Sequence, residues 1–154
     1  MFHIVLFEPE IPPNTGNIIR LCANTGMHLH LIEPLGFDWD DRRLKRAGLD
    51  YHEFVDVHRY ASLSAFISAV QPARLFGFSS HARRNAFEAA YEPGDAFMFG
   101  PETRGLPTDV TDNLGVDRLL RLPMRPKNRS LNLANSVSVI MYEAWRQQGF
   151  AGAG

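Results

Sequence analysis

The sequence is poor in cysteine, since Cys22 is the only one among 154 residues. This excludes an internal disulfide framework and a cysteine-rich zinc site. No apolar run approaches the roughly 20 residues that a membrane span needs. The first residues also lack the basic segment and the long apolar segment of a signal peptide. We therefore expect a cytoplasmic protein that is not bound to a membrane.

An excess of positive charge is missing as well. Sixteen Lys and Arg stand against seventeen Asp and Glu, which gives a net charge of −1. Bulk attraction to nucleic acid is therefore absent, and a polyanionic partner has to meet a local basic patch. The length predicts one compact domain over residues 1–154, with a frayed tail at 150–154.

Common ligand-binding motifs are absent. The sequence has no Gly-x-Gly-x-x-Gly fingerprint, no Gly-Lys-Ser/Thr phosphate loop and no Gly-x-Ser-x-Gly nucleophile elbow. His28 and His30 lie two residues apart on a predicted strand and could share a metal ion, but no third ligand is evident. Two solvent-facing histidines are therefore favoured, and no metal is expected. Cys22 falls on an apolar helix face, which favours a buried, unreactive thiol.

Short apolar runs alternate with helical patterns along the chain. The runs predict strands at 2–7, 29–32, 54–57, 75–78, 96–99 and 119–122. Helices are predicted from a cap at Asn14 or Thr15 to Gly26, at 40–47, at 63–70, and from a cap at Ser130 to Gly149. This alternation predicts an α/β domain with a mostly parallel sheet flanked by helices. Ligands of such sheets bind in loops beyond the carboxyl ends of the strands.

Two loops after predicted strands carry residues that a core does not require. In the loop and helix start at 8–20, Asn14, Asn17 and Arg20 recur at three-residue spacing along one side of the helix. This pattern fits a binding site or a capped helix with exposed polar residues. In the loop at 99–107, Gly100 and Gly105 bracket Glu-Thr-Arg and let the backbone approach a ligand. A tight turn into a helix near residue 107, with solvated charges, explains the second loop equally well.

A third loop, at 122–135, follows the last predicted strand and is basic. Between 118 and 129 the chain has no acidic residue and five basic ones, which are Arg118, Arg121, Arg125, Lys127 and Arg129. In a protein of net charge −1, this excess is the best candidate for an anion-binding surface. It leads into the N-terminus of the last helix, where free N–H groups favour a phosphate or carboxylate. A merely solvated loop is the alternative.

Taken in this order, the three loops resemble the signature motifs of the SPOUT class of RNA methyltransferases. The resemblance also includes Glu-Pro-Leu-Gly-Phe at 33–37, Arg-Ala-Gly-Leu-Asp-Tyr at 46–51 and the helix at 130–145, so it covers nearly the whole chain. It is closest to the branch that methylates the ribose 2′-hydroxyl of cytidine or uridine at wobble position 34 of tRNA.

The resemblance implies a fold, a reaction and partners. It implies a deep trefoil knot in the C-terminal part of the sheet, which no residue pattern could predict. It further implies S-adenosylmethionine as cofactor, the tRNA anticodon loop as substrate, and a homodimer with active sites at the subunit interface. The alternatives are methylation of another tRNA or rRNA position, and a non-catalytic RNA-binding dimer of the same fold.

The resemblance also assigns site residues. The positions that match the family's cofactor site are Phe78, Gly100, Leu122 and Ser130. Arg20 matches the arginine at the catalytic centre; because arginine normally stays protonated, we expect it to fix the substrate phosphate and hydroxyl rather than to act as a base. Candidates for RNA contact are Arg125 and Arg129 in the basic loop and Tyr142, whose helix spacing also permits packing at the dimer interface.

Overall fold

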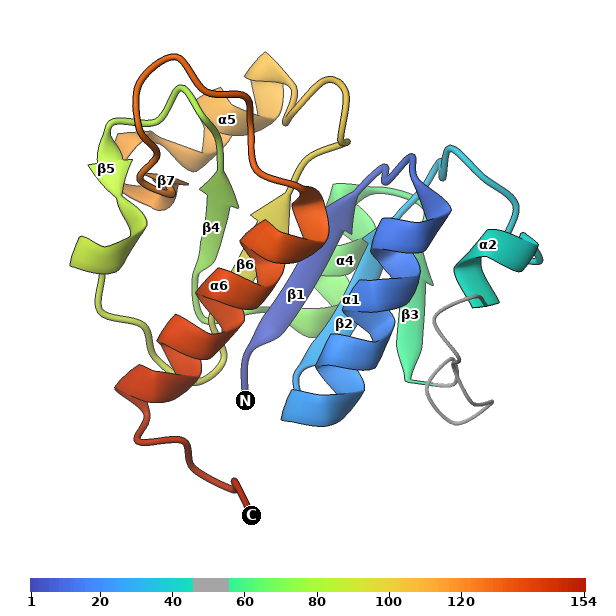
Figure 1. The fold of residues 1–154 in the computed structure, drawn as a ribbon, viewed down its shortest axis with the longest axis horizontal. Coiled ribbons are helices and arrows are strands. Elements are labelled where there is room, and N and C mark those ends of the chain that lie inside the picture. The colour runs from blue at the N-terminus through green and yellow to red at the C-terminus, as the bar shows by residue number, and fades with distance from the viewer. Residues whose placement is uncertain (46–55) are drawn as a thin grey trace.

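Seven parallel strands form one sheet in the computed structural model, which describes residues 1–45 and 56–154 (Figure 1). The strands are β1 (His3–Phe7), β2 (His28–Ile32), β3 (Val57–Tyr60), β4 (Leu75–Phe78), β5 (Arg84–Asn85), β6 (Ala96–Phe99) and β7 (Leu119–Arg121). The helices are α1 (Pro12–Thr25), α2 (Arg42–Lys45), α4 (Leu63–Val70), α5 (Thr108–Leu114) and α6 (Leu133–Gln147), with short 3-10 turns at Ala86–Glu88 and Val116–Arg118. The predicted α/β class is confirmed.

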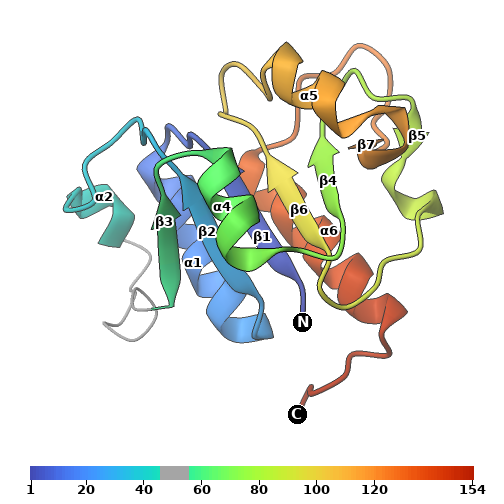
Figure 2. The same cartoon turned by 180° about the vertical axis from the view of Figure 1, so that it is seen from behind.

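Helices cover both faces of the sheet. In Figure 1, α1 and α6 lie across the near face of the sheet. Figure 2, which views the molecule from behind, shows α4 and α5 in front of the opposite face. Because both faces are covered, the strands can be apolar on both sides, which explains their nearly continuous apolar runs. Among the described residues, no helix combines the length and apolarity needed to cross a membrane.

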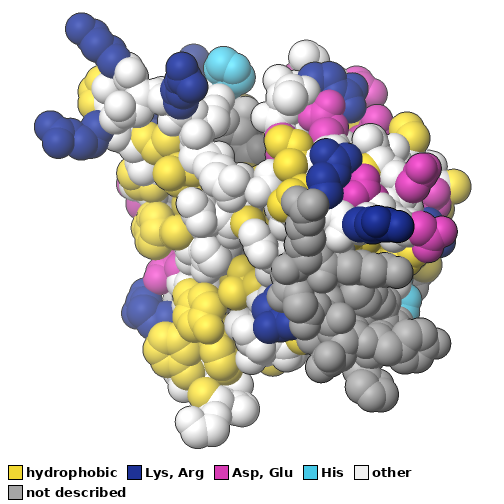
Figure 3. All heavy atoms as spheres, turned by 45° about the vertical axis from the view of Figure 1, so that its right-hand side comes forward, with side chains coloured by type: hydrophobic (Ala, Val, Ile, Leu, Met, Phe, Trp, Pro, Cys, Tyr) yellow, Lys and Arg dark blue, Asp and Glu magenta, His cyan; other side chains and the backbone are white. Residues whose placement is uncertain are grey.

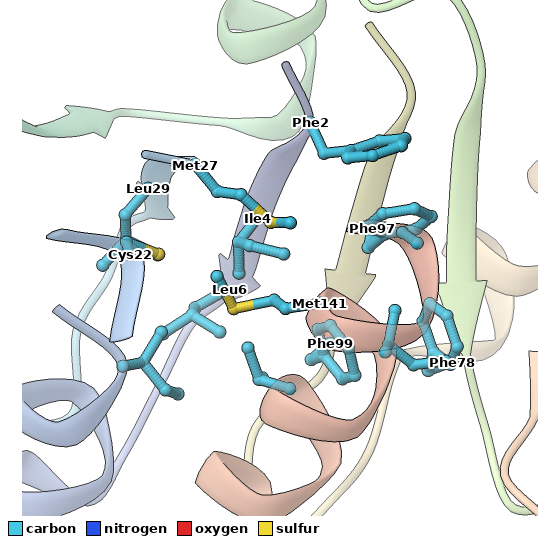
Figure 4. Close-up of a cluster of buried hydrophobic side chains, with 14 of the residues drawn as sticks. Phe2, Ile4, Leu6, Cys22, Met27, Leu29, Phe78, Phe97, Phe99 and Met141 are labelled. Carbon is cyan, nitrogen blue, oxygen red and sulfur yellow. The ribbon is translucent and has the colours of Figure 1, made fainter. Parts of the chain in front are cut away.

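The core has two parts because side chains alternate along each strand. Leu6 of β1 packs with Cys22 of α1 and Met141 of α6 in the larger hydrophobic cluster (Figure 4). Its neighbour Val5 belongs to the second cluster, together with Phe66 of α4. Burial raises the pKa of the Cys22 thiol to about 12. The prediction that this cysteine is buried is confirmed.

Helix α1 begins earlier than predicted. Its N-cap is Ile11 and its first residue is Pro12. A proline suits this position because its missing N–H has no intrahelical partner to lose and its ring presets φ. The predicted caps, Asn14 and Thr15, therefore lie inside the helix, so this prediction is wrong. The predicted end is confirmed, since Gly26 adopts a left-handed φ of 75° at the C-cap.

Helix α6 begins later than predicted. The predicted cap was Ser130, whereas the observed N-cap is Asn132, whose side-chain oxygen accepts a hydrogen bond from the N–H of Asn135. An asparagine caps a helix as well as a serine does, so residue type alone could not decide between them. At the other end, Gly149 has a left-handed φ of 66°, directly after the C-cap Gln148.

The predicted strands at 75–78 and 96–99 coincide with β4 and β6, and the predicted helix at 63–70 coincides with α4. The strand predicted at 54–57 is misplaced, because β3 begins at Val57 and residues 54–55 lie outside the described residues. The helix predicted at 40–47 corresponds to α2, and residues 46–47 lie outside the described part. Strand β5 has two residues, too few for any periodic pattern to predict.

The strand order at one edge of the sheet is unusual. The order is β3-β2-β1-β6-β4-β7-β5, so β7 lies between β4 and β5 although these two follow each other in the chain. The connection at 79–83 therefore has to pass across β7, and its Ser79 N–H donates to the carbonyl of Leu120 in that strand at 3.0 Å. The connections at this edge are interleaved. The trefoil knot that the resemblance implies stays a prediction.

Candidate functional site

A cavity of about 460 Å³ opens beside the carboxyl ends of β4, β6 and β7. Its walls come from the loops that follow these strands and from the start of α6. The predicted cofactor residues Phe78, Gly100, Leu122 and Ser130 all line it. The fold thus gathers four positions that are far apart in the sequence around one space, at the edge where a parallel sheet binds ligands.

Two stacked aromatic rings form an apolar part of the cavity wall. The rings of Phe78 and Phe99 lie 4.6 Å apart between centroids and are nearly parallel, at 8°. Polar side chains of Ser79, Ser130 and Asn132 line the same cavity. This mixture suits a ligand that has both an aromatic and a polar portion.

Gly100 is required by the tightness of the wall. A Cβ atom at this position would lie 2.3 Å from the backbone nitrogen of Leu106 and 2.4 Å from the carbonyl carbon of Gly105. Backbone atoms cannot move aside as a flexible side chain can, so no larger residue fits without distorting the loop. Gly105 itself has a left-handed φ of 69°, which closes the turn that follows.

Asn132 connects α1 and α6 beside the cavity. While its Oδ1 caps α6, its Nδ2 donates to Oδ1 of Asn14 at 3.0 Å. Asn14 is buried and lines the cavity. The alternative that Asn14 is an exposed polar residue of a capped helix is therefore wrong. A polar side chain in the first turn of α1 forms part of the site wall instead.

Glu102 holds the start of α1 from another loop. Its Oε1 accepts from the N–H of Glu10 at 2.8 Å, and its Oε2 accepts from the N–H of Ile11 at 2.8 Å and from Nδ2 of Asn14 at 3.3 Å. Ile11 has no side-chain oxygen with which to cap the helix, so the carboxylate supplies the missing acceptors. Its negative charge also suits the positive end of the helix dipole.

Arg20 lies elsewhere on α1. It is absent from the described residues that line the cavity, is partly exposed, and follows Asn14 by more than one helical turn. Asn17, between them, is exposed. The predicted row of Asn14, Asn17 and Arg20 is therefore divided, with only Asn14 at the cavity of the same chain.

The basic loop surrounds one side of the cavity. Arg125 and Arg129 are exposed in the connection between β7 and α6, and Arg121 lines the cavity. Figure 3 shows Lys and Arg side chains that project from one corner of the molecule. Arg118 differs from the others, because its guanidinium lies over the ring of Phe76 at 5.2 Å, within range of a cation–π contact.

Tyr142 lies on the outer surface of α6 and is absent from the described residues that line the cavity. It is 45% exposed and its ring packs against that of Trp145 in a T-shaped arrangement, with 5.7 Å between ring centroids. Leu131 and Val139 are also exposed, at 44% and 41%. These residues give α6 and its approach an exposed apolar surface.

The two histidines of β2 have different surroundings. His30 is buried, with its Nε2 2.9 Å from Nδ1 of His3 and its Nδ1 3.0 Å from the Tyr60 hydroxyl. The prediction of solvent-facing histidines is wrong for His30 and right for His28, which is exposed. Within residues 1–45 and 56–154, no group of three His, Cys, Asp or Glu side chains is placed to hold a metal ion.

The sequence matches the SpoU rRNA Methylase family over residues 1–142. The tRNA (cytidine(34)-2′-O)-methyltransferase of Aeromonas hydrophila subsp. hydrophila is 58% identical over 153 residues, which cover 99% of this chain and 98% of the relative. The enzyme of the same name from Escherichia coli K12 has the same identity and the same coverage.

Solved structures show the same similarity. One that concerns the 2-OH methylation of C/U34 on tRNA superposes with a TM-score of 0.87, at 46% identity and with 97% of both chains covered. The SpoU methyltransferase AviRb from Streptomyces viridochromogenes, in complex with the cofactor AdoMet, has a TM-score of 0.82 and 27% identity. That match covers 97% of this chain and 61% of AviRb.

Proposed function

The chain belongs to the SpoU rRNA Methylase family, and from this premise we propose that it methylates the ribose 2′-hydroxyl of wobble nucleotide 34 in tRNA, with S-adenosylmethionine as methyl donor. The observation that carries the proposal is the 58% identity, over 99% of the chain, to relatives named for methylation of cytidine 34. The cavity that gathers the predicted cofactor residues supports it.

The cavity fits the chemistry of S-adenosylmethionine. Its volume of about 460 Å³ falls within the range of roughly 300–1,000 Å³ that small-molecule sites occupy. We assign Phe78, Gly100, Leu122 and Ser130 to hold the cofactor, largely through their backbone groups. When bound, the cofactor supplies a sulfonium methyl group, and the protein supplies orientation and a dry pocket.

Arg20 is assigned to orient the substrate. A guanidinium stays protonated at neutral pH and cannot take up the proton of the ribose hydroxyl. Its planar set of N–H donors instead suits a bidentate contact with phosphate oxygens. We infer that Arg20 fixes the substrate phosphate and the 2′-hydroxyl, and that the hydroxyl proton leaves to the phosphate or to water. Alignment of this kind can lower a barrier by roughly 7–11 kcal/mol.

A homodimer would complete the site. Arg20 is absent from the described lining of the cavity in its own chain, which agrees with an active site built from two subunits. The exposed apolar surface of α6, with Val139 and Tyr142, is suited to pack against a second copy. Tyr142 is assigned to this interface or to the adjacent RNA.

The tRNA anticodon loop is assigned to the basic rim of the cavity. Arg125 and Arg129 are exposed there, and in a chain of net charge −1 such a local excess has to provide the phosphate contacts. We place the enzyme in the cytoplasm, which agrees with a single, buried cysteine.

Mapping the modified nucleotide tests the proposed function. The purified protein is incubated with methyl-labelled S-adenosylmethionine and total tRNA, and the labelled ribose is located. Label at nucleotide 34 is expected. Label at another tRNA position, or in rRNA only, would contradict methylation of nucleotide 34 and identify a different substrate. Cofactor binding by calorimetry separates an inactive enzyme from an RNA-binding dimer that does not take up the cofactor.

Replacement of Arg20 tests its assignment. The variant Arg20→Ala is expected to abolish methyl transfer and to keep cofactor affinity within about twofold, because Arg20 lies outside the cofactor residues. The matched control is Arg43→Ala, which removes an exposed arginine that is paired with Asp41 and is absent from the described residues that line the cavity. Full activity of Arg20→Ala would remove this residue from the mechanism.

A further inference from the structure

Each of two loops at the site has a glutamate that accepts hydrogen bonds from the other loop. Glu102 reaches from the loop after β6 to the backbone before α1, as described above. In return, Oε1 of Glu10 accepts from the backbone N–H of Thr103 at 2.9 Å and from its hydroxyl at 2.7 Å. Each loop therefore uses a carboxylate to satisfy donors of the other loop, across about 90 residues of sequence.

The local sequence of α1 makes this exchange necessary. Pro12 and Pro13 have no N–H to offer, and the N-cap Ile11 has no cap of its own. The N–H groups of Glu10 and Ile11 both donate to Glu102. A residue of the opposite loop consequently helps to set the position of the helix start, because both of these N–H groups donate to the carboxylate of Glu102.

On the other side, Glu10 holds a turn that lines the cavity. The N–H of Gly105 donates to the carbonyl of Pro101 at 2.8 Å, which closes this turn, and Thr103 lies at its tip. Glu10 itself is absent from the described residues that line the cavity. Within its own chain, Glu10 therefore acts on the cavity through the turn that it holds.

Hydrogen bonds rather than ion pairs hold the two loops together. Among the described residues, Arg104 pairs with this loop, with Nε 3.8 Å from Oε2 of Glu10 and Nη2 3.6 Å from Oε1 of Glu8. Its side chain is 59% exposed, and exposed pairs at such distances contribute little. The donors on Thr103 lie about 1 Å closer to Glu10 than this cation does.

We propose that Glu10 and Glu102 form a reciprocal clasp that fixes helix α1, which carries Arg20, to the wall of the cofactor cavity at 101–105, and that Glu10 is a positioning residue for methyl transfer. The inference rests on the proposed function for its catalytic readout. The clasp joins helix α1, with Arg20, to the wall of the cofactor cavity as one rigid unit. Arg20 and the cofactor therefore keep their alignment when a large substrate binds.

The two glutamates differ in a way that one substitution can test. Glu10 accepts both bonds on one oxygen, so Glu10→Gln can keep them with its amide oxygen. Glu102 uses both oxygens, so Glu102→Gln has to turn an NH₂ group toward a backbone N–H or lose that contact. The same change is therefore expected to be mild at Glu10 and severe at Glu102.

Steady-state kinetics on tRNA and calorimetry with S-adenosylmethionine provide the test. For Glu10→Ala we expect kcat to fall about tenfold and the cofactor Kd to rise about tenfold, whereas Glu10→Gln stays within about threefold of the wild type. For Glu102→Gln we expect kcat to fall at least tenfold, and the double variant with Glu10→Ala to be little worse than the more severe single change.

Glu88→Ala, which removes an exposed carboxylate outside both loops, is the control. Equal loss in Glu10→Ala and Glu10→Gln, or none in either, would overturn the proposal.

Amide hydrogen exchange keeps the test decisive when activity is lost for other reasons. Glu10→Ala should lose protection at Thr103 while the amides of β1 stay protected, which distinguishes a loosened turn from global unfolding. If the wild type binds the cofactor but does not methylate tRNA, the proposed function is wrong. The cofactor Kd and the amide exchange at Thr103 then still test whether Glu10 holds the turn. Unchanged protection at Thr103 would refute the clasp alone.

Discussion

The two ends of the parallel strands are built differently. At the carboxyl ends, polar side chains such as Glu102, Asn14 and Asn132 link one loop to another around an open cavity. At the amino end of β6, by contrast, a charged side chain is buried. Asp95, directly before β6, is 0% exposed, and its two oxygens accept from Nε and Nη2 of Arg74 at 2.9 and 2.6 Å.

This difference separates function from stability. Loops at the carboxyl ends can change residue type without disturbing the strands, so a ligand site can be built there on a fixed sheet. A smaller cavity of about 300 Å³ lies at the amino ends of β2 and β3, and buried polar groups such as Asp95 at the amino end of β6 contribute to the free energy of unfolding. Changes at the carboxyl ends should therefore affect binding first, and changes at the amino ends should affect stability first.

The largest effect on binding is expected for Gly100→Ala. The new Cβ would meet backbone atoms of Leu106 and Gly105 at 2.3 and 2.4 Å, so the wall of the cavity has to deform. We expect the affinity for S-adenosylmethionine to fall at least a hundredfold, as measured by calorimetry.

Gly115→Ala is the matched control for this change. Gly115 has a left-handed φ of 84°, and nothing lies within 4 Å of its added Cβ. With φ 84° and ψ 165°, Gly115 lies in a backbone region that essentially only glycine adopts, so the control should lose roughly 1–3 kcal/mol of stability to backbone strain, with cofactor affinity unchanged. A Gly100→Ala variant that binds the cofactor normally would contradict the tight wall described here.

At the opposite end, Asp95→Ala should affect stability and leave binding intact. The change removes the acceptor for Arg74 and for the N–H of Glu92. Loss of one partner of a buried pair costs roughly 3–5 kcal/mol, and because Arg74 is 26% exposed the lower end, about 3 kcal/mol, is expected in urea unfolding. Cofactor affinity at low temperature should stay unchanged, and a selective loss of affinity would break the comparison.

Asn132 lies where the comparison is least clear, since it both caps α6 and lines the cavity. Asn132→Ala should lower the free energy of unfolding by about 1–2 kcal/mol, because α6 loses its cap. Asn132→Asp keeps a capping oxygen but has no N–H for Asn14. We expect Asn132→Asp to recover the stability in urea unfolding and not the methyl transfer. Recovery of both would mean that the link between the helices is dispensable.

Local patterns were sufficient for much of the fold. The helix at 63–70 was predicted correctly because its apolar spacing and its cap are contained in a few neighbouring residues, with Ser62 accepting from the N–H of Ala65. The strand order could not be predicted in this way. Nothing in the spacing of residues indicates that β7 lies between β4 and β5, because strand pairing depends on contacts between distant segments.

The site was predictable only in part. The resemblance to a known family named Phe78, Gly100, Leu122 and Ser130, and the structure places them around one cavity. The role of Glu102 was missed, because its hydrogen-bond partners lie 88 to 92 residues away. A carboxylate in a turn looks solvated until the helix start that lacks its own acceptor is seen opposite it.

The last prediction concerns a cluster of histidines on β1 to β3, in which His3 and His28 begin their strands and His30 lies in the middle of β2. Burial and the neighbouring histidines His3, His58 and His28 lower the pKa of His30 from 6.5 to about 3, and burial lowers that of His3 as well. Below pH 6.5 the unfolded chain therefore binds protons that the folded chain does not bind, and stability is lost as the pH falls from 6.5 toward 3. Between pH 7.5 and 5.5 we expect His30 to account for a loss of about 1 kcal/mol in urea unfolding.

Matched variants assign this loss to one end of the sheet. His30→Asn removes the buried imidazole that bonds to His3 and Tyr60, so the difference in stability between the two pH values should shrink, whatever the absolute stability of the variant. His81→Asn changes an exposed histidine at the cavity and should keep the wild-type difference. If instead His81→Asn abolished the loss and His30→Asn did not, the proton-linked stability would belong to the carboxyl ends, and the division between a functional end and a stabilising end of the sheet would be wrong.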